Sequence, residues 1–370
     1  MGNSKKKRES DTGIWETFKS DFKSEGLKDD IKYDFTETLE FYLTDEQKQR
    51  LKEMGWFKKI FFIPAWLLRV LFFKLTRIRR LLLVLAIVLY VISGNIIISD
   101  NVRSDSNTTF FSVLILLFIL ILELKDKLIA RDELSAGRAV QTAFMPPQNP
   151  NIPGWSLWLY SRPANSVGGD MVDLIKIDKN NFGIALGDVS GKELGAALYM
   201  VKLQSTLRAL VSDSESLAEL GSKINSIFFR DSEPNRFATM IYFGLSKGSG
   251  NIKILNAGHI PPLTLSGGKI TELEKGSAAI GIKKKSNYRE QQLVLKKGDL
   301  IISYSDGVTE AVNQSGEFFG AERLKQILKA NKYLSPEEMG KVILNHVKDF
   351  SGKCRLFDDL SIIIIKYEGN

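Results

Sequence analysis

The apolar residues of this chain form long runs in its first third and short runs after that. Residues 81–99 carry no charged side chain and consist mainly of Leu, Val and Ile, and residues 108–122 form a second uncharged run. A helix needs about 20 apolar residues to cross the hydrocarbon core of a bilayer. The two runs therefore predict a transmembrane hairpin over residues 81–124, with spans at 81–99 and 108–124.

The polar residues around these runs predict which way the hairpin is oriented. Residues 100–107 form a short turn without net positive charge, whereas Lys125, Lys127 and Arg131 follow the second run. Positive residues favour the cytoplasmic side. We therefore expect a multi-pass protein of the inner (cytoplasmic) membrane, with both termini and everything after residue 124 in the cytoplasm. A pair of buried core helices is the alternative interpretation.

Residues 56–80 combine basic and bulky apolar side chains. Between positions 58 and 80 there is no acidic residue, and the cations are Lys58, Lys59, Arg69, Lys74, Arg77, Arg79 and Arg80. This pattern next to an apolar run is typical of an amphipathic helix on a membrane surface. The formal net charge of +8 would also suit nucleic-acid binding. Its concentration beside the spans instead favours membrane lipid as the partner, and we expect no nucleic acid to bind.

The flanking segments have weaker patterns. Residues 1–55 are polar, of mixed charge, and expected to lie in the cytoplasm. Residues 125–147 have helical spacing and end at Pro146 and Pro147, which stop a helix. This segment fits a plain helical linker or a dimeric coiled coil, so a homodimer is one expectation.

From residue 148 to 370 the pattern changes to short apolar runs punctuated by glycine. The candidate strands are 155–161, 174–177, 182–186, 238–245, 252–256, 291–295, 300–304 and 360–367. The candidate helices are 196–211, 216–229, 321–330 and 336–350. Most strands come in neighbouring pairs, which favours antiparallel hairpins over regular strand–helix alternation. The sequence therefore predicts an α+β layered domain.

Aspartates recur where these strands end. The chain has one cysteine and two histidines, so most ligands of any metal site must be carboxylates, and these favour hard cations such as Mg²⁺ or Mn²⁺. A single Asp-Gly pair is most often a turn. Several aspartates at the ends of buried strands would repel one another without a cation. The acidic positions are Asp170, Asp188, Asp306, Asp358 and Asp359.

These aspartates belong to an ordered set of motifs. The motifs are Phe144-Met145-Pro146-Pro147, Val167-Gly168-Gly169-Asp170, Asp188-Val189-Ser190-Gly191-Lys192, Asn256-Ala257-Gly258-His259, Ser305-Asp306-Gly307-Val308-Thr309-Glu310 and Asp358-Asp359-Leu360-Ser361. Over about residues 138–367 the set resembles the bacterial SpoIIE/RsbU-type protein serine phosphatases. The resemblance implies the metal-dependent PP2C superfamily, whose fold is a β-sandwich flanked by helices.

The resemblance also implies a site and a substrate. Asp170, Asp188, Asp306 and Asp358 would be catalytic and would bind two Mn²⁺ or Mg²⁺ ions. The Val189 carbonyl would complete the site, and Asp359 is a rival to Asp358. The implied reaction is hydrolysis, by metal-activated water, of phosphoserine or phosphothreonine on a regulatory protein of the anti-sigma factor antagonist type.

Some positions depart from the family pattern, and other functions compete. Met171 and Val172 stand where aromatic residues are common, and Glu193 replaces a usual glycine. A diguanylate cyclase is set aside because Glu-Phe does not follow Gly-Gly-Asp. The alternative function is a catalytically inactive, membrane-tethered scaffold that binds a signalling partner. His259 is expected to be a structural residue in a turn.

Overall fold

The computed structural model describes residues 42–95, 106–191, 193–352, 354 and 356–369, with a few isolated positions before residue 42. Contacts divide the chain into two compact units, Met1–Lys127 and Leu128–Asn370. Most of the predicted N-terminal polar segment, the end of the first predicted span and most of the loop after it lie outside the described residues. Lys192 of the Asp188 motif lies outside them as well.

The first unit is helical where it is described. Helix α3 spans Asp45–Glu53 and begins with a capping box between Thr44 and Gln47. Helix α4 spans Trp56–Lys74, and none of its described side chains is buried. Helix α5 spans Arg77–Asn95, and α6 spans Ser106–Phe144, so that α6 continues into the second unit.

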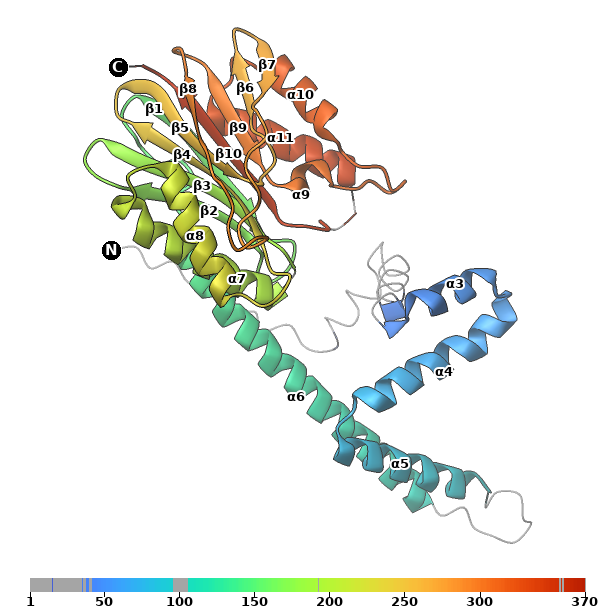
Figure 1. Ribbon diagram of the computed structural model, residues 1–370. Coiled ribbons are helices and arrows are strands. Elements are labelled where there is room, and N and C mark those ends of the chain that lie inside the picture. Colours follow the sequence, from blue (N-terminus) through green and yellow to red (C-terminus); the bar gives the residue numbers. More distant parts are fainter. Residues whose placement is uncertain are drawn as a thin grey trace, which may run out of the picture. The chain divides into compact units, whose positions relative to one another are not determined.

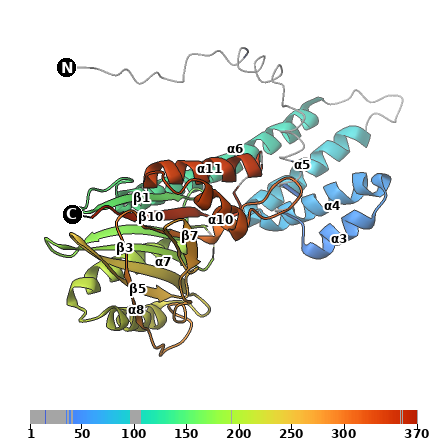
Figure 2. The ribbon, with the colours of Figure 1, turned by 90° about the horizontal axis from the view of Figure 1, so that it is seen from above.

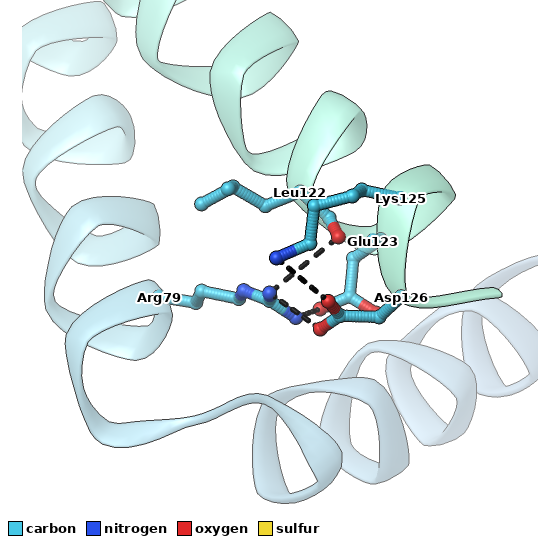
Figure 3. A network of polar contacts seen from close by, with 5 residues as sticks. All are labelled: Arg79, Leu122, Glu123, Lys125 and Asp126. Atoms are coloured by element: carbon cyan, nitrogen blue, oxygen red, sulfur yellow. Dashed lines mark hydrogen bonds and ion pairs between the residues drawn. The ribbon is translucent and has the colours of Figure 1, made fainter. Parts of the chain in front are cut away.

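Within the first unit, described side chains of α5 and α6 bond to each other near Arg79 and near Ser112. The Arg79 guanidinium donates hydrogen bonds to Glu123 Oε1 and Asp126 Oδ2, both at 2.6 Å (Figure 3). Deeper along the pair, Ser112 Oγ donates to the Ala86 carbonyl at 2.8 Å. Ala86 and Ser112 are both buried. The small residues at this second contact let the two helix backbones approach closely.

One helix among the described residues is long and apolar enough to cross a membrane, and it is α6 from Thr108 onward. Its apolar segment is mostly exposed, as Phe110, Phe118 and Leu120 illustrate. This helix contains the second predicted span. The described residues therefore give one candidate span and not the two that the sequence predicts.

The second unit contains two five-stranded antiparallel sheets (Figure 1). The first has the order β1-β10-β9-β6-β7, with strands Trp155–Arg162, Leu360–Tyr367, Leu300–Tyr304, Leu263–Ser266 and Lys269–Glu272. The second has the order β2-β3-β4-β5-β8, with strands Asp170–Lys176, Asn181–Val189, Ala238–Ser246, Ser249–Ala257 and Glu290–Val294.

Helices cover the outer face of each sheet, which gives four layers (Figures 1 and 2). Helices α10 (Ala321–Ala330) and α11 (Pro336–Ser351) pack on the first sheet. Helices α7 (Glu193–Leu210) and α8 (Leu217–Asp231) pack on the second. The remaining core lies between the sheets. Strand β10 is apolar at consecutive positions because Ile362 and Ile364 face α11 whereas Ile363 and Ile365 face the other sheet.

The predicted elements of this unit agree with the observed ones, and the predicted α+β layered architecture is correct. Strands β6 and β7, with four residues each, and the one-turn helix α9 (Asp306–Thr309) were not predicted. They are too short to produce a recognisable hydrophobic period. Strand β2 also begins earlier than predicted, at Asp170, so this aspartate lies on a strand and not in the preceding loop.

Candidate metal centre

Two of the five predicted aspartates lie opposite each other on neighbouring strands of the second sheet. Asp170 is the first residue of β2 and Asp188 is the penultimate residue of β3, and the antiparallel register pairs them directly. Asp170 is only 4% exposed. Like charges directly opposite each other on paired strands repel. The pairing therefore places like charges together where the surrounding protein removes water.

The other three aspartates come from neighbouring strands of the first sheet. Asp306 begins α9, two residues after β9 ends, and Asp358 and Asp359 immediately precede β10. Because β9 pairs with β10, these segments lie together: Ser305 N donates to the Ser361 carbonyl, and Ser305 Oγ donates to the Asp359 carbonyl. A side chain at Gly307 would collide with the Asp359 carbonyl, so glycine permits this approach.

Asp359 connects the two sheets through backbone hydrogen bonds. Its Oδ1 accepts from Ala164 N at 2.8 Å, and its Oδ2 accepts from Gly169 N at 2.6 Å and from Asp170 N at 3.3 Å. A Cβ at Gly168 would collide with this carboxylate. Both Asp359 oxygens are thus occupied by N–H groups. Asp358 uses Oδ1 to accept from the backbone N of Asp359.

The electrostatics of the cluster disfavour the ionised carboxylates. Burial, followed by the charge of Asp188, raises the pKa of Asp170 well above its usual value. Burial and the charges of Asp306, Asp358 and Asp359 raise the pKa of Asp188 to about 7. The pKa of Asp306 is raised by burial and by Asp358. A bound cation would remove these repulsions.

The donor set suits a hard cation. Among the described residues nothing donates a hydrogen bond to Oδ2 of Asp170, although that atom is fully buried. The Val189 carbonyl and Asp188 Oδ1 lie 2.9 and 3.7 Å from the point where a Cβ on Gly169 would stand. Oxygen donors of this kind fit Mg²⁺ or Mn²⁺. Within the described residues, however, no three His, Cys, Asp or Glu side chains form a group ready to hold one ion.

The loop after β3 is held by an arginine that the sequence did not identify. Arg236 Nη1 donates to the Ser190 carbonyl at 2.7 Å, and Ser190 Oγ accepts from Phe237 N at 3.0 Å. Gly191 has φ of +108°, and a Cβ there would collide with the Arg236 guanidinium. Arg236 and Gly191 together fix the backbone that follows the Val189 carbonyl.

Asp173 lies on β2 with Asp170 but on the opposite face of the strand. Side chains alternate along a strand, so Asp170 and Val172 face the other sheet whereas Met171 and Asp173 face α7. Asp173 is fully buried and accepts two hydrogen bonds from Arg208, at 2.8 Å from Nε and 2.6 Å from Nη2. Asp173 therefore has its own protein cation and does not join the acidic cluster.

His259 is structural, as the sequence predicts. Its backbone N donates to Asn256 Oδ1, and the Asn256 amide donates to the His259 carbonyl, which closes the turn after β5. Its Nδ1 lies 2.9 Å from Thr239 Oγ1. Burial lowers the pKa of His259 to about 4, so the ring is neutral near pH 7. A neutral, buried ring in a closed turn is poorly placed to act as a general acid.

Comparisons with known proteins agree with this fold. The family model of Stage II sporulation protein E (SpoIIE) matches residues 178–368, which is just over half of the chain. Protein IcfG from Synechocystis is 27% identical over 66% of this chain and 42% of its own length. Phosphoserine phosphatase RsbU from Bacillus subtilis is 27% identical over 64% of this chain and 70% of its own length. The chain thus spans less than half of IcfG.

Solved structures show the same fold. The SiaA-PP2C domain of Pseudomonas aeruginosa superposes with a TM-score of 0.58 at 16% identity, over 65% of this chain and 98% of that domain. The RsbU and RsbW domains of Rv1364c from Mycobacterium tuberculosis superpose with a TM-score of 0.52 at 22% identity, over 60% of this chain and 62% of that one. With the family model matched over most of the second unit, this chain belongs to the SpoIIE family of PP2C-type bacterial serine phosphatases.

Proposed function

We propose that this chain is a membrane-anchored, metal-dependent protein serine/threonine phosphatase. The observation that carries the proposal is the cluster of aspartates from four strand ends, in which Asp170 is buried with Oδ2 unpartnered among the described residues. Such a cluster is costly for a fold to maintain. The chain belongs to a serine phosphatase family, and phosphatase activity would explain why the fold keeps this unfavourable cluster.

In this proposal the aspartates have two roles, metal binding and connection of the two sheets. Asp170, Asp188, Asp306 and Asp358 bind metal with the Val189 carbonyl, and Asp359 holds the two sheets together because its oxygens already accept three backbone hydrogen bonds. Two Mn²⁺ or Mg²⁺ ions, when bound, would supply positive charge for the phosphate oxygens and lower the pKa of the attacking water. The residues 148–370 form the phosphatase domain.

The proposed substrate is phosphoserine or phosphothreonine on a regulatory protein. RsbU of Bacillus subtilis is named a phosphoserine phosphatase, and it matches this chain over 64% of its residues. We extend this to a substrate of the anti-sigma factor antagonist type. The extension rests on the motif resemblance from Asp170 to Ser361, and dephosphorylation would alter which regulator that protein binds.

We further propose that the first unit anchors the enzyme. Helix α6 supplies one span, and α5 is proposed as the second because its Ala86 packs on Ser112 and its Arg79 pairs with acids at the cytoplasmic end of α6. Helix α4, with Trp56, Phe57 and Phe61 exposed, would lie on the membrane surface. Labelling of single cysteines placed in residues 100–107 of intact cells would test the topology: labelling from outside supports two spans, and protection contradicts them.

The activity is tested with the full chain in detergent. Mn²⁺-dependent phosphate release from a phosphoserine peptide, and then from a phosphorylated anti-sigma antagonist, is measured beside Asp306→Asn. We expect the variant to lose more than about 100-fold, because even residues that only support metal ligands contribute 10–100-fold. The matched control is Asp349→Asn on the exposed side of α11, which should keep full activity.

Two results would count against the proposal. Equal turnover by wild type and Asp306→Asn would remove the aspartate cluster from the reaction. Silence of the wild type together with undetectable Mn²⁺ binding would favour the inactive scaffold, which should keep its effect on a partner after Asp306→Asn.

A further inference from the structure

The last turns of α6 place a buried amide against the loop that carries Asp170. Gln141 is 3% exposed, whereas its neighbour Val140 is 52% exposed. Gln141 Nε2 donates to the Gly168 carbonyl at 2.9 Å, and Gly168 N donates back to Gln141 Oε1 at 3.2 Å. A glutamine amide has a donor and an acceptor at its tip, so it can satisfy both backbone groups of one residue.

Gly168 lies two residues before Asp170, in the loop that leads to the cluster of Asp170, Asp188, Asp306, Asp358 and Asp359 (the acidic cluster). The next two residues, Gly169 and Asp170, donate their N–H groups to Asp359 Oδ2. The loop is therefore held on one side by Gln141 and on the other by Asp359. Gly168 also leaves no room for a side chain on the Asp359 side. A shift of Gly168 would move both the Asp170 carboxylate and the backbone donors to Asp359.

The position of Gln141 is itself fixed by the second unit. The carbonyl of Phe144, at the end of α6, accepts from Gln204 Nε2 at 3.2 Å and from Arg208 Nη2 at 3.3 Å. Gly137, one turn before Gln141, lies beside Leu194 and Val167. These contacts hold the end of α6 against α7 and the Gly168 loop, so the Gln141 amide has a rigid support.

We propose that Gln141 is a positioning residue for the metal-binding loop. By holding both backbone groups of Gly168, it sets the backbone from Gly168 to Asp170 and thereby the affinity of the Asp170 site for metal. Gln141 does not touch the substrate. The inference rests on the proposed function, because it assigns Asp170 to metal binding.

The test uses the full chain in detergent and two substitutions of Gln141. Gln141→Leu keeps the size of the side chain and removes both hydrogen bonds, and Gln141→Glu keeps an acceptor for Gly168 N but removes the donor for its carbonyl. The control is Thr142→Ala: Thr142 is exposed, and its hydroxyl donates within its own helix to the Arg138 carbonyl. Three quantities are measured for each protein: Mn²⁺ affinity from the electron paramagnetic resonance of free Mn²⁺, amide exchange of residues 165–171, and kcat against Mn²⁺ concentration.

We expect Gln141→Leu to raise the Mn²⁺ dissociation constant and the half-saturating Mn²⁺ concentration about tenfold, as loss of a support for metal ligands does. Excess Mn²⁺ should restore kcat, and amide exchange of residues 165–171 should become faster in the metal-free protein. Gln141→Glu should change in the same direction, and Thr142→Ala should match the wild type.

The inference fails if both Gln141 variants keep wild-type Mn²⁺ affinity and amide exchange, or if their activity loss persists at saturating Mn²⁺. Failure of the proposed function looks different. In that case the wild type neither binds Mn²⁺ nor releases phosphate, while exchange of residues 165–171 still reports whether Gln141 holds the loop.

Discussion

Strand β2 carries one buried aspartate on each face, and the two have opposite electrostatic surroundings. On the face toward α7, Asp173 is fully buried and receives two hydrogen bonds from the Arg208 guanidinium. On the face toward the other sheet, Asp170 is 4% exposed and is surrounded by carboxylates, with Oδ2 unpartnered among the described residues. The two residues are three positions apart on one strand.

The difference separates a structural carboxylate from a candidate functional one. A buried charge needs a partner, and a protein cation supplies it permanently at Asp173. At Asp170 the described residues supply acids instead. Burial, followed by the charge of Asp188, raises its pKa, and a bound metal ion would favour the ionised carboxylate again. Burial of an aspartate alone is thus weak evidence for a metal site, and the absence of a cationic partner among the described residues is the stronger sign.

The largest effect should come from Asp170→Asn. We expect Mn²⁺-dependent turnover to fall more than about 100-fold, since a ligand should contribute more than its supporting residues do. Asp170 has a raised pKa, so its ionisation destabilises the metal-free fold as the pH rises above the usual carboxyl range. At pH 8 without metal, the melting temperature of the variant should therefore exceed that of the wild type. A lower melting temperature would contradict this account.

Asp173→Asn should give the opposite result on stability. Loss of the charged hydrogen bonds to Arg208 should lower the free energy of unfolding of the metal-free protein by about 2 kcal/mol, because such bonds contribute about 1.5–3 kcal/mol each. Urea unfolding measures this, and Asp349→Asn on the exposed side of α11 is the control. If Asp173→Asn were as stable as the wild type while Mn²⁺ affinity fell, Asp173 would belong with the metal site.

The smallest effect should come from Arg79→Gln. Like Asp170 and Asp173, Arg79 has charged groups around it, in this case the carboxylates of Glu123 and Asp126. Here the cation is present and its partners Glu123 and Asp126 are about half exposed, so solvent already screens them (Figure 3). We expect Mn²⁺ affinity and kcat to stay unchanged, with at most a small decrease in the melting temperature in detergent. A large loss of activity would show that this ion pair controls the second unit.

Most of the second unit could be predicted from its sequence because its strands and helices are long and regularly patterned. The run Ile362–Ile365 and the strand before Asp188 are examples, and the ordered aspartate motifs located the candidate site. Gln141, Arg208 and Arg236 were not identified. Each acts through a contact between distant segments, such as Gln141 with Gly168, and local patterns carry no information on such pairs. Predicting that Asp170 and Asp173 point to opposite faces would also have required the correct start of β2. That start was predicted four residues too late.

The strand order of the first sheet governs when the protein can complete its fold during synthesis. Strand β1 lies at the edge of that sheet and pairs with β10, from Trp155 opposite Tyr367 to Arg162 opposite Leu360. About two hundred residues must leave the ribosome between the two partners, and such distant pairing is slow. Asp358 and Asp359 arrive with the same final strand. The helices of the first unit are therefore synthesised long before Asp358 and Asp359. Any membrane insertion of these helices can thus precede assembly of the acidic cluster.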